Sequence, residues 1–238
     1  MKWPRQSKRV LQWAGGVIVV MLIWMAAPLA LRHMSFFRVR QVEIVGIRYL
    51  GADQVLAALA LSPHASVFDD TDVLVDRLRA LDGVAEVAVT RRPPGSLKVV
   101  VRETEPVAFV ANARGALTVV DAGSRPLPFE LVSLDLPVVQ TGQKSDSGVV
   151  AVLARIQAVD PALFQTIDAA RVTEDEASDV VLDVGRHRLL LEPDASPEVI
   201  QSVVLVARDL AAKARPYAEL DARYAGQIVV RRRGSRIV

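Results

Sequence analysis

The longest apolar stretch of the chain lies near its start, where positions 10–31 carry no charged side chain. About 20 apolar residues are enough for a helix to cross a bilayer. A cleaved secretory signal begins in a similar way, but its apolar core is shorter and ends at an Ala-x-Ala-like site. No such triplet occurs between Val10 and Arg40. We therefore expect residues 10–31 to form a retained transmembrane helix behind a short tail, residues 1–9.

The charges that flank this segment do not decide its orientation. The tail carries four Lys and Arg residues, and Arg32, Arg38, Arg40 and Arg48 follow the apolar run. The positive-inside count is therefore close to a tie. A short leading tail is typical of a signal-anchor, and long domains are exported largely regardless of their charge. We expect a cytoplasmic N-terminus and an exported remainder.

Residues 39–103 show the periodicities of a small α+β domain. Positions 39–45 alternate between apolar and polar residues, which predicts a half-buried strand that ends at Gly46. Leucines and valines at helical spacing then predict two short helices, and two alternating strands follow around a Pro-Pro-Gly loop. The expected order is strand, helix, helix, strand, strand.

Acidic residues mark the expected starts of both helices. Asp53 is the expected N-cap of the first helix, and the acidic cluster of residues 69–72 opens the second, with Gly83 expected near its C-terminal cap. An acidic cluster also suits metal binding or acid/base chemistry. Because the rest of a calcium-binding EF-hand loop is missing, we interpret these carboxylates as capping groups that interact with the helix dipole.

The second half of the chain predicts a sheet with two covering helices. Expected strands are residues 117–120, 180–184, 188–192, 218–224 and 227–233. An amphipathic helix is expected from Val149 to near Asp160, after a polar loop at residues 143–148. A longer helix is expected to begin at Ser196 and Pro197, with Ile200, Val203, Val204 and Ala207 facing inward. Ala225 and Gly226 are the expected turn between the last two strands.

Composition and motifs argue against several functional classes. The chain has 29 Lys and Arg residues against 27 Asp and Glu. Without the four basic residues of the tail, 25 basic residues face 27 acidic ones, so the part expected to be exported is near neutral and lacks the strongly basic character of a nucleic-acid binder. The absence of cysteine excludes disulfides and thiolate chemistry. The three histidines lack zinc-site spacing, and no G-x-S-x-G, S-x-x-K or phosphate-binding loop occurs. We expect no enzyme activity, no cofactor, no metal and no small-molecule substrate.

Two segments resemble a known family. Residues 36–46 (FFRVRQVEIVG) look like the opening strand of a POTRA domain that follows a membrane anchor. Residues 91–108, with Arg91-Arg92-Pro93 and Leu97-x-Val99-x-Val101-x-Glu103, are similar to the closing hairpin of the FtsQ/DivIB cell-division proteins. The family usually has an aromatic residue where Arg92 stands here. The resemblance implies a POTRA domain at residues 32–106 and a C-terminal β domain, mixed α/β with a mainly antiparallel sheet, at residues 107–238.

The resemblance also implies a partner and a site. Asp221-Ala222-Arg223-Tyr224 is similar to the family's Asp-x-Arg-Tyr segment, near the strands where partner proteins dock. The family's partner, the FtsB/FtsL pair, is then expected to add a strand to this sheet edge. The expected partner-binding residues are Arg223, Tyr224, Gly226, Gln227 and Ile228. The alternative is that Tyr224 packs in the core and Arg223 is simply solvated.

The resemblance further implies a location and a role. The chain is expected to be a single-pass inner-membrane protein with periplasmic domains, concentrated at the division septum. There it would link early and late divisome proteins, with the POTRA domain facing the upstream components. Two other classes stay open: another POTRA-bearing polypeptide-transport component, and an anchored periplasmic enzyme. The basic C-terminal residues 231–236 are interpreted as a solvated terminus or as an electrostatic aid to an acidic partner.

Overall fold

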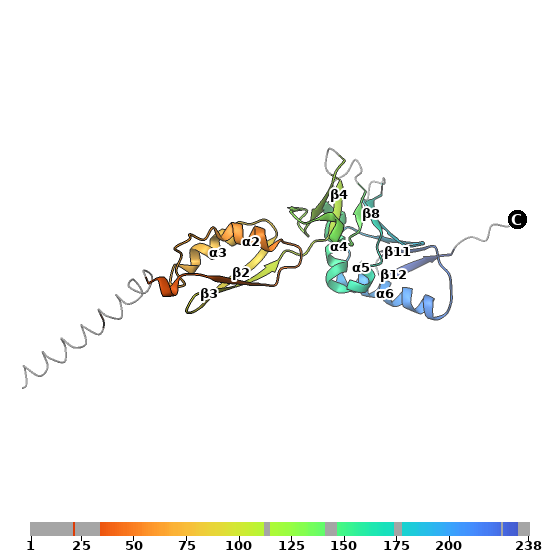
Figure 1. Ribbon diagram of the computed structural model, residues 1–238. Helices are drawn as coiled ribbons and strands as arrows, with labels where there is room; N and C mark the ends of the chain where they lie inside the picture. The colour runs from red at the N-terminus through yellow and green to blue at the C-terminus, as the bar shows by residue number, and fades with distance from the viewer. Residues whose placement is uncertain are drawn as a thin grey trace, which may run out of the picture. The chain divides into compact units, whose positions relative to one another are not determined.

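The chain divides into two compact units, Met1–Glu103 and Thr104–Val238, in a computed structural model (Figure 1). The residues that the structure describes are 21, 34–111, 115–140, 147–173, 178–224 and 226–232. The expected tail and transmembrane helix lie outside these residues, apart from Met21. Among the described residues, no helix has the length and apolar character needed to span a bilayer.

Unit 1 has the expected order of strand, helix, helix, strand, strand after a short 3-10 turn. Its elements are η1 (Ser35–Phe37), β1 (Gln41–Val45), α2 (Ala52–Leu59), α3 (Thr71–Arg79), β2 (Val84–Arg92) and β3 (Ser96–Glu103). The sheet order is β1-β3-β2, with β1 parallel and β2 antiparallel to β3. Every second residue of β3 is buried, and Leu97, Val99 and Val101 form its core face. Their period of two is what places one face of the sheet against the helices.

The caps of the two helices differ in part from the expectation. Asp70 is the N-cap of α3 and accepts a hydrogen bond from the Asp72 amide at 2.9 Å, which confirms the capping interpretation of the acidic cluster. The expectation that Asp53 caps α2 is wrong, because Gly51 is the N-cap and Asp53 lies in the first turn. Gly83 is not the cap of α3, since Ala80 is the C-cap of this helix and Gly83 leads into β2 with φ of 90°.

Glu103 fixes the loop that follows β1. Its carboxylate is buried and accepts backbone N–H groups from Arg48, Tyr49 and Leu50 at 2.8–3.1 Å. Gly46 starts this loop with φ of 95°, and a Cβ atom there would lie 2.1 Å from the Val101 carbonyl oxygen. A residue with a side chain would therefore both strain the backbone and collide with β3.

Unit 2 is built on a nine-stranded mixed sheet of the described residues. Its strands are β4 (Ala108–Ala111), β5 (Leu117–Val120), β6 (Pro126–Leu127), β7 (Val138–Val139), β8 (Ala169–Val172), β9 (Val180–Val184), β10 (His187–Leu191), β11 (Glu219–Tyr224) and β12 (Gln227–Arg231). Its helices are η2 (Leu131–Ser133), α4 (Ser147–Val159), α5 (Pro161–Phe164) and α6 (Pro197–Ala212). The strand order is β12-β11-β10-β9-β8-β7-β4-β5-β6, and β10/β11, β7/β8 and β4/β7 are the parallel pairs.

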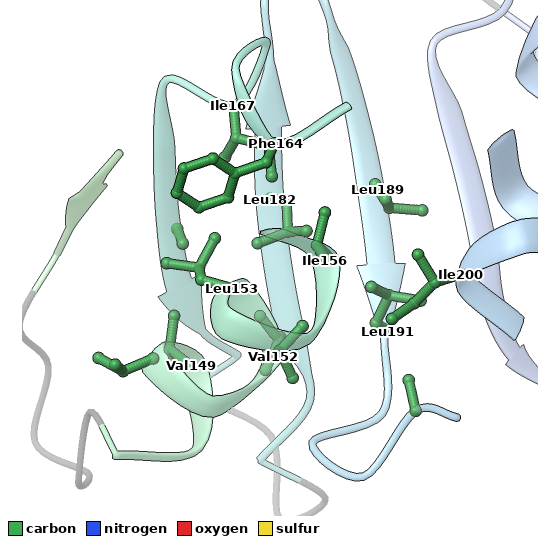
Figure 2. Packing of buried hydrophobic residues seen from close by; sticks show 14 of the residues in the cluster. Val149, Val152, Leu153, Ile156, Phe164, Ile167, Leu182, Leu189, Leu191 and Ile200 are labelled. Atoms are coloured by element: carbon green, nitrogen blue, oxygen red, sulfur yellow. The ribbon is translucent and has the colours of Figure 1, made fainter. Parts of the chain in front are cut away.

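Helix α4 supplies the centre of the core of unit 2. Figure 2 shows its apolar face directed at the sheet, with Leu153 and Ile156 beside Leu182 of β9. Helix α6 covers the neighbouring part of the sheet through Ile200, close to Leu191 of β10. These side chains are fully or almost fully buried. This packing gives α6 a fixed position relative to β11 and β12, the last two strands.

Several predictions for unit 2 need correction. Ser147 and Gly148 belong to α4 and not to a loop, while residues 141–146 lie outside the described part of the chain. Asp160 caps a further short helix, α5, by accepting the Leu163 amide. On α6, Val206 packs against the core where the spacing had favoured Val204.

Candidate partner-binding edge

Strand β12 forms one edge of the nine-stranded sheet. It pairs with β11 on one side and with no other strand of the described residues on the other. Val229 and Val230 are 39% and 36% exposed, so the strand is apolar and partly uncovered. An edge of this kind presents a row of backbone N–H and C=O groups to an incoming strand.

A groove of about 440 Å³ runs between α6 and the last hairpin. Val199 and Val206 line it from α6, and Ile228 lines it from β12. Tyr224 borders the groove and is 52% exposed, so its ring is available to a partner. Apolar walls beside an open strand edge are suited to the side chains of an added strand.

An ion network supports the hairpin from beneath. Arg223 donates hydrogen bonds to the Asp221 carboxylate through Nε and a terminal nitrogen, both at 2.8 Å, and to Asp179 at 2.7 Å. Asp221 has no exposed surface, and Arg231 of β12 lies 3.7 Å from it. The hydrogen bonds from Arg223 lower the pKa of Asp221, and the same bonds together with those to Asp179 raise the pKa of Arg223. Asp221 and Arg223 therefore both carry their charges at neutral pH.

The structure brings the expected site residues together on one hairpin, in different surroundings. Tyr224, Gly226, Gln227 and Ile228 all line the groove, and Gly226 has the positive φ, 69°, that the turn requires. Arg223 instead points into the ion network, with its side chain 22% exposed. The alternative reading is wrong for both residues it names, since Tyr224 is half exposed and Arg223 is held by two carboxylates.

The sequence did not single out the α6 wall of the groove or Asp179. Val199 and Val206 look like ordinary core positions of an amphipathic helix, and Asp179 lies 42 positions before Asp221 without any recognisable motif. A helical pattern identifies which face is apolar but not how far the neighbouring strands cover that face. Their place in the groove and in the ion network can be recognised only once the packing of α6 and the strands is known.

His187 and Tyr217 contact each other within the fold. His187 stacks on Tyr217 with ring centroids 4.2 Å apart, and its Nδ1 lies 2.8 Å from the Tyr217 carbonyl oxygen. Burial raises the pKa of Tyr217. Within the described ranges, no three His, Asp or Glu side chains are grouped so that they would hold a metal ion.

Residues 37–104 match the family model for the POTRA domain, FtsQ-type. The chain is also 30% identical over 140 residues to cell division protein FtsQ of Mycolicibacterium smegmatis, a match that covers 56% of this chain and 41% of that protein. FtsQ of Rhodothermus marinus is 32% identical over 93 residues, 39% of this chain and 31% of that protein. Over about half of its length the chain is therefore similar to FtsQ cell-division proteins, and residues 37–104 match the FtsQ-type POTRA domain.

Two further comparisons show similarity to proteins of the same kind. FtsQ of Bradyrhizobium diazoefficiens is 28% identical over 135 residues, which is 55% of this chain and 40% of that protein. The major extracytoplasmic domain of DivIB from Geobacillus stearothermophilus aligns with 46% of this chain and 96% of its own length, at 13% identity and a TM-score of 0.35. The chain thus spans less than half of the length of the curated relatives that it matches.

Proposed function

We propose that the chain is a single-pass membrane scaffold of the bacterial division machinery, with residues 1–9 in the cytoplasm and residues 32–238 outside it at the septum. Three relatives are named cell division protein FtsQ, and this supports a role in division. The uncharged run of residues 10–31 supports a membrane anchor. In this proposal the protein acts by holding partners in place, and residues 32–106 form the domain that faces upstream components.

We infer that unit 2 binds the FtsB/FtsL pair by strand addition to β12. The observation that carries this proposal is the combination of an open edge strand with the apolar groove beside it, bordered by an exposed tyrosine. Backbone hydrogen bonds to β12 would supply affinity, and side chains that enter the groove would supply selectivity. Arg223 then acts as a positioning residue, since its two carboxylate partners hold the hairpin that carries Tyr224.

Tyrosine is a residue type that often dominates the energy of an interface, where truncation costs about 2 kcal/mol or more, or roughly 30-fold in affinity. Tyr224→Ala should therefore weaken binding of the FtsB/FtsL ectodomain to the exported part of this chain by about that factor. Leu205→Ala is the matched control, because Leu205 is 66% exposed on α6 and does not line the groove. Calorimetry of both variants tests the site. An unchanged affinity for folded Tyr224→Ala would remove β12 and its groove from the proposal.

A further inference from the structure

Residues 34–40 are fastened to unit 1 by its own fold. The Phe37 carbonyl oxygen accepts the Val67 amide at 2.9 Å, and the Val39 amide donates to the Ala65 carbonyl oxygen at 2.9 Å. The ring of Phe37 packs edge-to-face on Phe68, with centroids 5.0 Å apart. This segment is therefore a fixed part of the domain surface and not a loose linker.

The same segment exposes large apolar side chains. Met34 and Phe36 are 51% and 56% exposed. The Phe36 ring is held in this position by an edge-to-face contact with Phe37, 5.1 Å between centroids. A fixed and exposed aromatic ring costs free energy in water, but it suits the interfacial layer of a bilayer, where aromatic side chains gather.

Two arginines lie in the same segment as the exposed apolar side chains. Arg38 and Arg40 are exposed, and neither forms an ion pair with another described residue. The Arg40 guanidinium meets a single neutral group, the Ser35 carbonyl oxygen, at 3.5 Å. Unneutralised arginines beside exposed apolar side chains are complementary to phosphate headgroups above an acyl layer.

The sheet brings the β2–β3 turn to the same end of the unit. The Arg40 amide donates to the Gly95 carbonyl oxygen at 2.8 Å, and Gln41 pairs with Ser96 at the start of β3. Arg91 and Arg92 at the end of β2 therefore lie at this end too. Figure 1 shows η1, coloured red-orange, at one end of the unit.

The carboxylates at this end are already engaged. Glu43 pairs with Arg92 at 3.0 Å and with Lys98 at 3.8 Å. Asp69 accepts the Ser66 amide at 2.7 Å, and Asp70 caps α3. The basic residues at this end outnumber the acidic ones by five to four, so its net charge is positive: Arg38, Arg40, Arg91, Arg92 and Lys98 against Glu43, Asp69, Asp70 and Asp72.

We propose that this end of unit 1 rests on the membrane surface, with Met34 and Phe36 in the interfacial layer and Arg38 and Arg40 on anionic lipid phosphates. The inference rests on the proposed anchor. The uncharged run ends at Leu31, so at most about 10 Å of chain separates it from Met34. A rigid domain on so short a tether meets the headgroups with this end, and the contact orients it.

The absence of cysteine makes single labels straightforward. The full chain, reconstituted into phosphatidylcholine discs with and without phosphatidylglycerol, would carry an environment-sensitive fluorophore at Phe36→Cys or Thr90→Cys. Thr90 is exposed on β2, two residues before its end, and is far from the anchor in sequence. Val100→Cys is the matched control, because Val100 is 40% exposed and pairs with Val45 at the opposite end of β1.

Spin-labelled lipid headgroups should quench the labels at positions 36 and 90 in the anionic discs and leave position 100 unaffected. Replacing Arg38 and Arg40 by Gln should reduce the ratio of docked to undocked chain about fivefold for each charge removed, which is the expected contribution of one basic residue at an anionic surface. The proposal would be overturned if the labels at Thr90 and Val100 were quenched equally. It would also be overturned if the quenching at Thr90 changed neither with phosphatidylglycerol nor with the replacement of the arginines. A Phe36 label that is insensitive to lipid and responds instead to added FtsB/FtsL pair would overturn it as well. A chain that elutes apart from the discs would refute the anchor itself.

Discussion

The ion network under the last hairpin gives the sharpest quantitative prediction, for the variant Asp221→Ala. The substitution removes two charge-assisted hydrogen bonds, both 2.8 Å long, from a carboxylate with no exposed surface. Breaking a buried pair from one side costs about 3–5 kcal/mol. Arg223 keeps Asp179 as a partner and is 22% exposed, which places the expected loss near the lower end, at about 3 kcal/mol.

Asp183→Ala is the matched control, on β9 of the same sheet. Asp183 also pairs with two arginines, Arg171 and Arg188, but its side chain is 30% exposed, so the expected loss is about 0.5–1 kcal/mol. All three tryptophans precede residue 25, so fluorescence does not report on unit 2. Urea unfolding is better followed by pulsed hydrogen exchange of peptides from β10. A loss for Asp221→Ala below 1 kcal/mol, or no larger than that for Asp183→Ala, would refute the supporting role of the network.

Three further predictions concern acidity and the two cores. The pKa of Asp221 is lowered in the fold, so its contribution to the free energy of unfolding should be complete above its ordinary pKa of 3.8 and should vanish as the pH falls through the folded pKa. The difference in stability between wild type and Asp221→Asn, measured from pH 7 to pH 3, should therefore shrink in acid. Glu103→Gln should destabilise unit 1 by about 2 kcal/mol, since the carboxylate accepts three backbone amides, whereas exposed Glu86→Gln should cost less than 1 kcal/mol in the same urea titration. Leu153→Ala should cost about 2–5 kcal/mol by hydrogen exchange, against less than about 0.5 kcal/mol for Leu205→Ala; similar losses would show that α4 does not carry the core.

Local periodicity was sufficient to predict most of unit 1. Alternation in β1, β2 and β3 and the leucine spacing of α3 produced the observed order, because each pattern encodes which face of its element is buried. The misplaced caps have a simple cause. Asp53 and Gly83 are suitable residue types, but a cap depends on where the backbone turns, and neighbouring Gly51 and Ala80 occupy those positions instead.

Unit 2 was harder to predict because its sheet depends on contacts between distant segments. Strands β6 and β7 have two residues each, too few to show any periodicity. The strand order that leaves β12 at the edge, and the Asp179–Arg223 pair across 44 positions, follow from tertiary pairing alone. The site residues expected on the hairpin were predicted from their resemblance to a family segment, whereas the α6 wall of the groove required the structure.

Hydrogen exchange of residues 32–238, with and without the FtsB/FtsL ectodomain, tests the central claim most directly. Strand addition should slow exchange in β12 (Gln227–Arg231), whose outward amides have no strand partner among the described residues. Exchange in β6, at the opposite edge, should stay unchanged. Protection of β12 alone among the edges supports the account. A stable complex that leaves the exchange of β12 unaltered would contradict it.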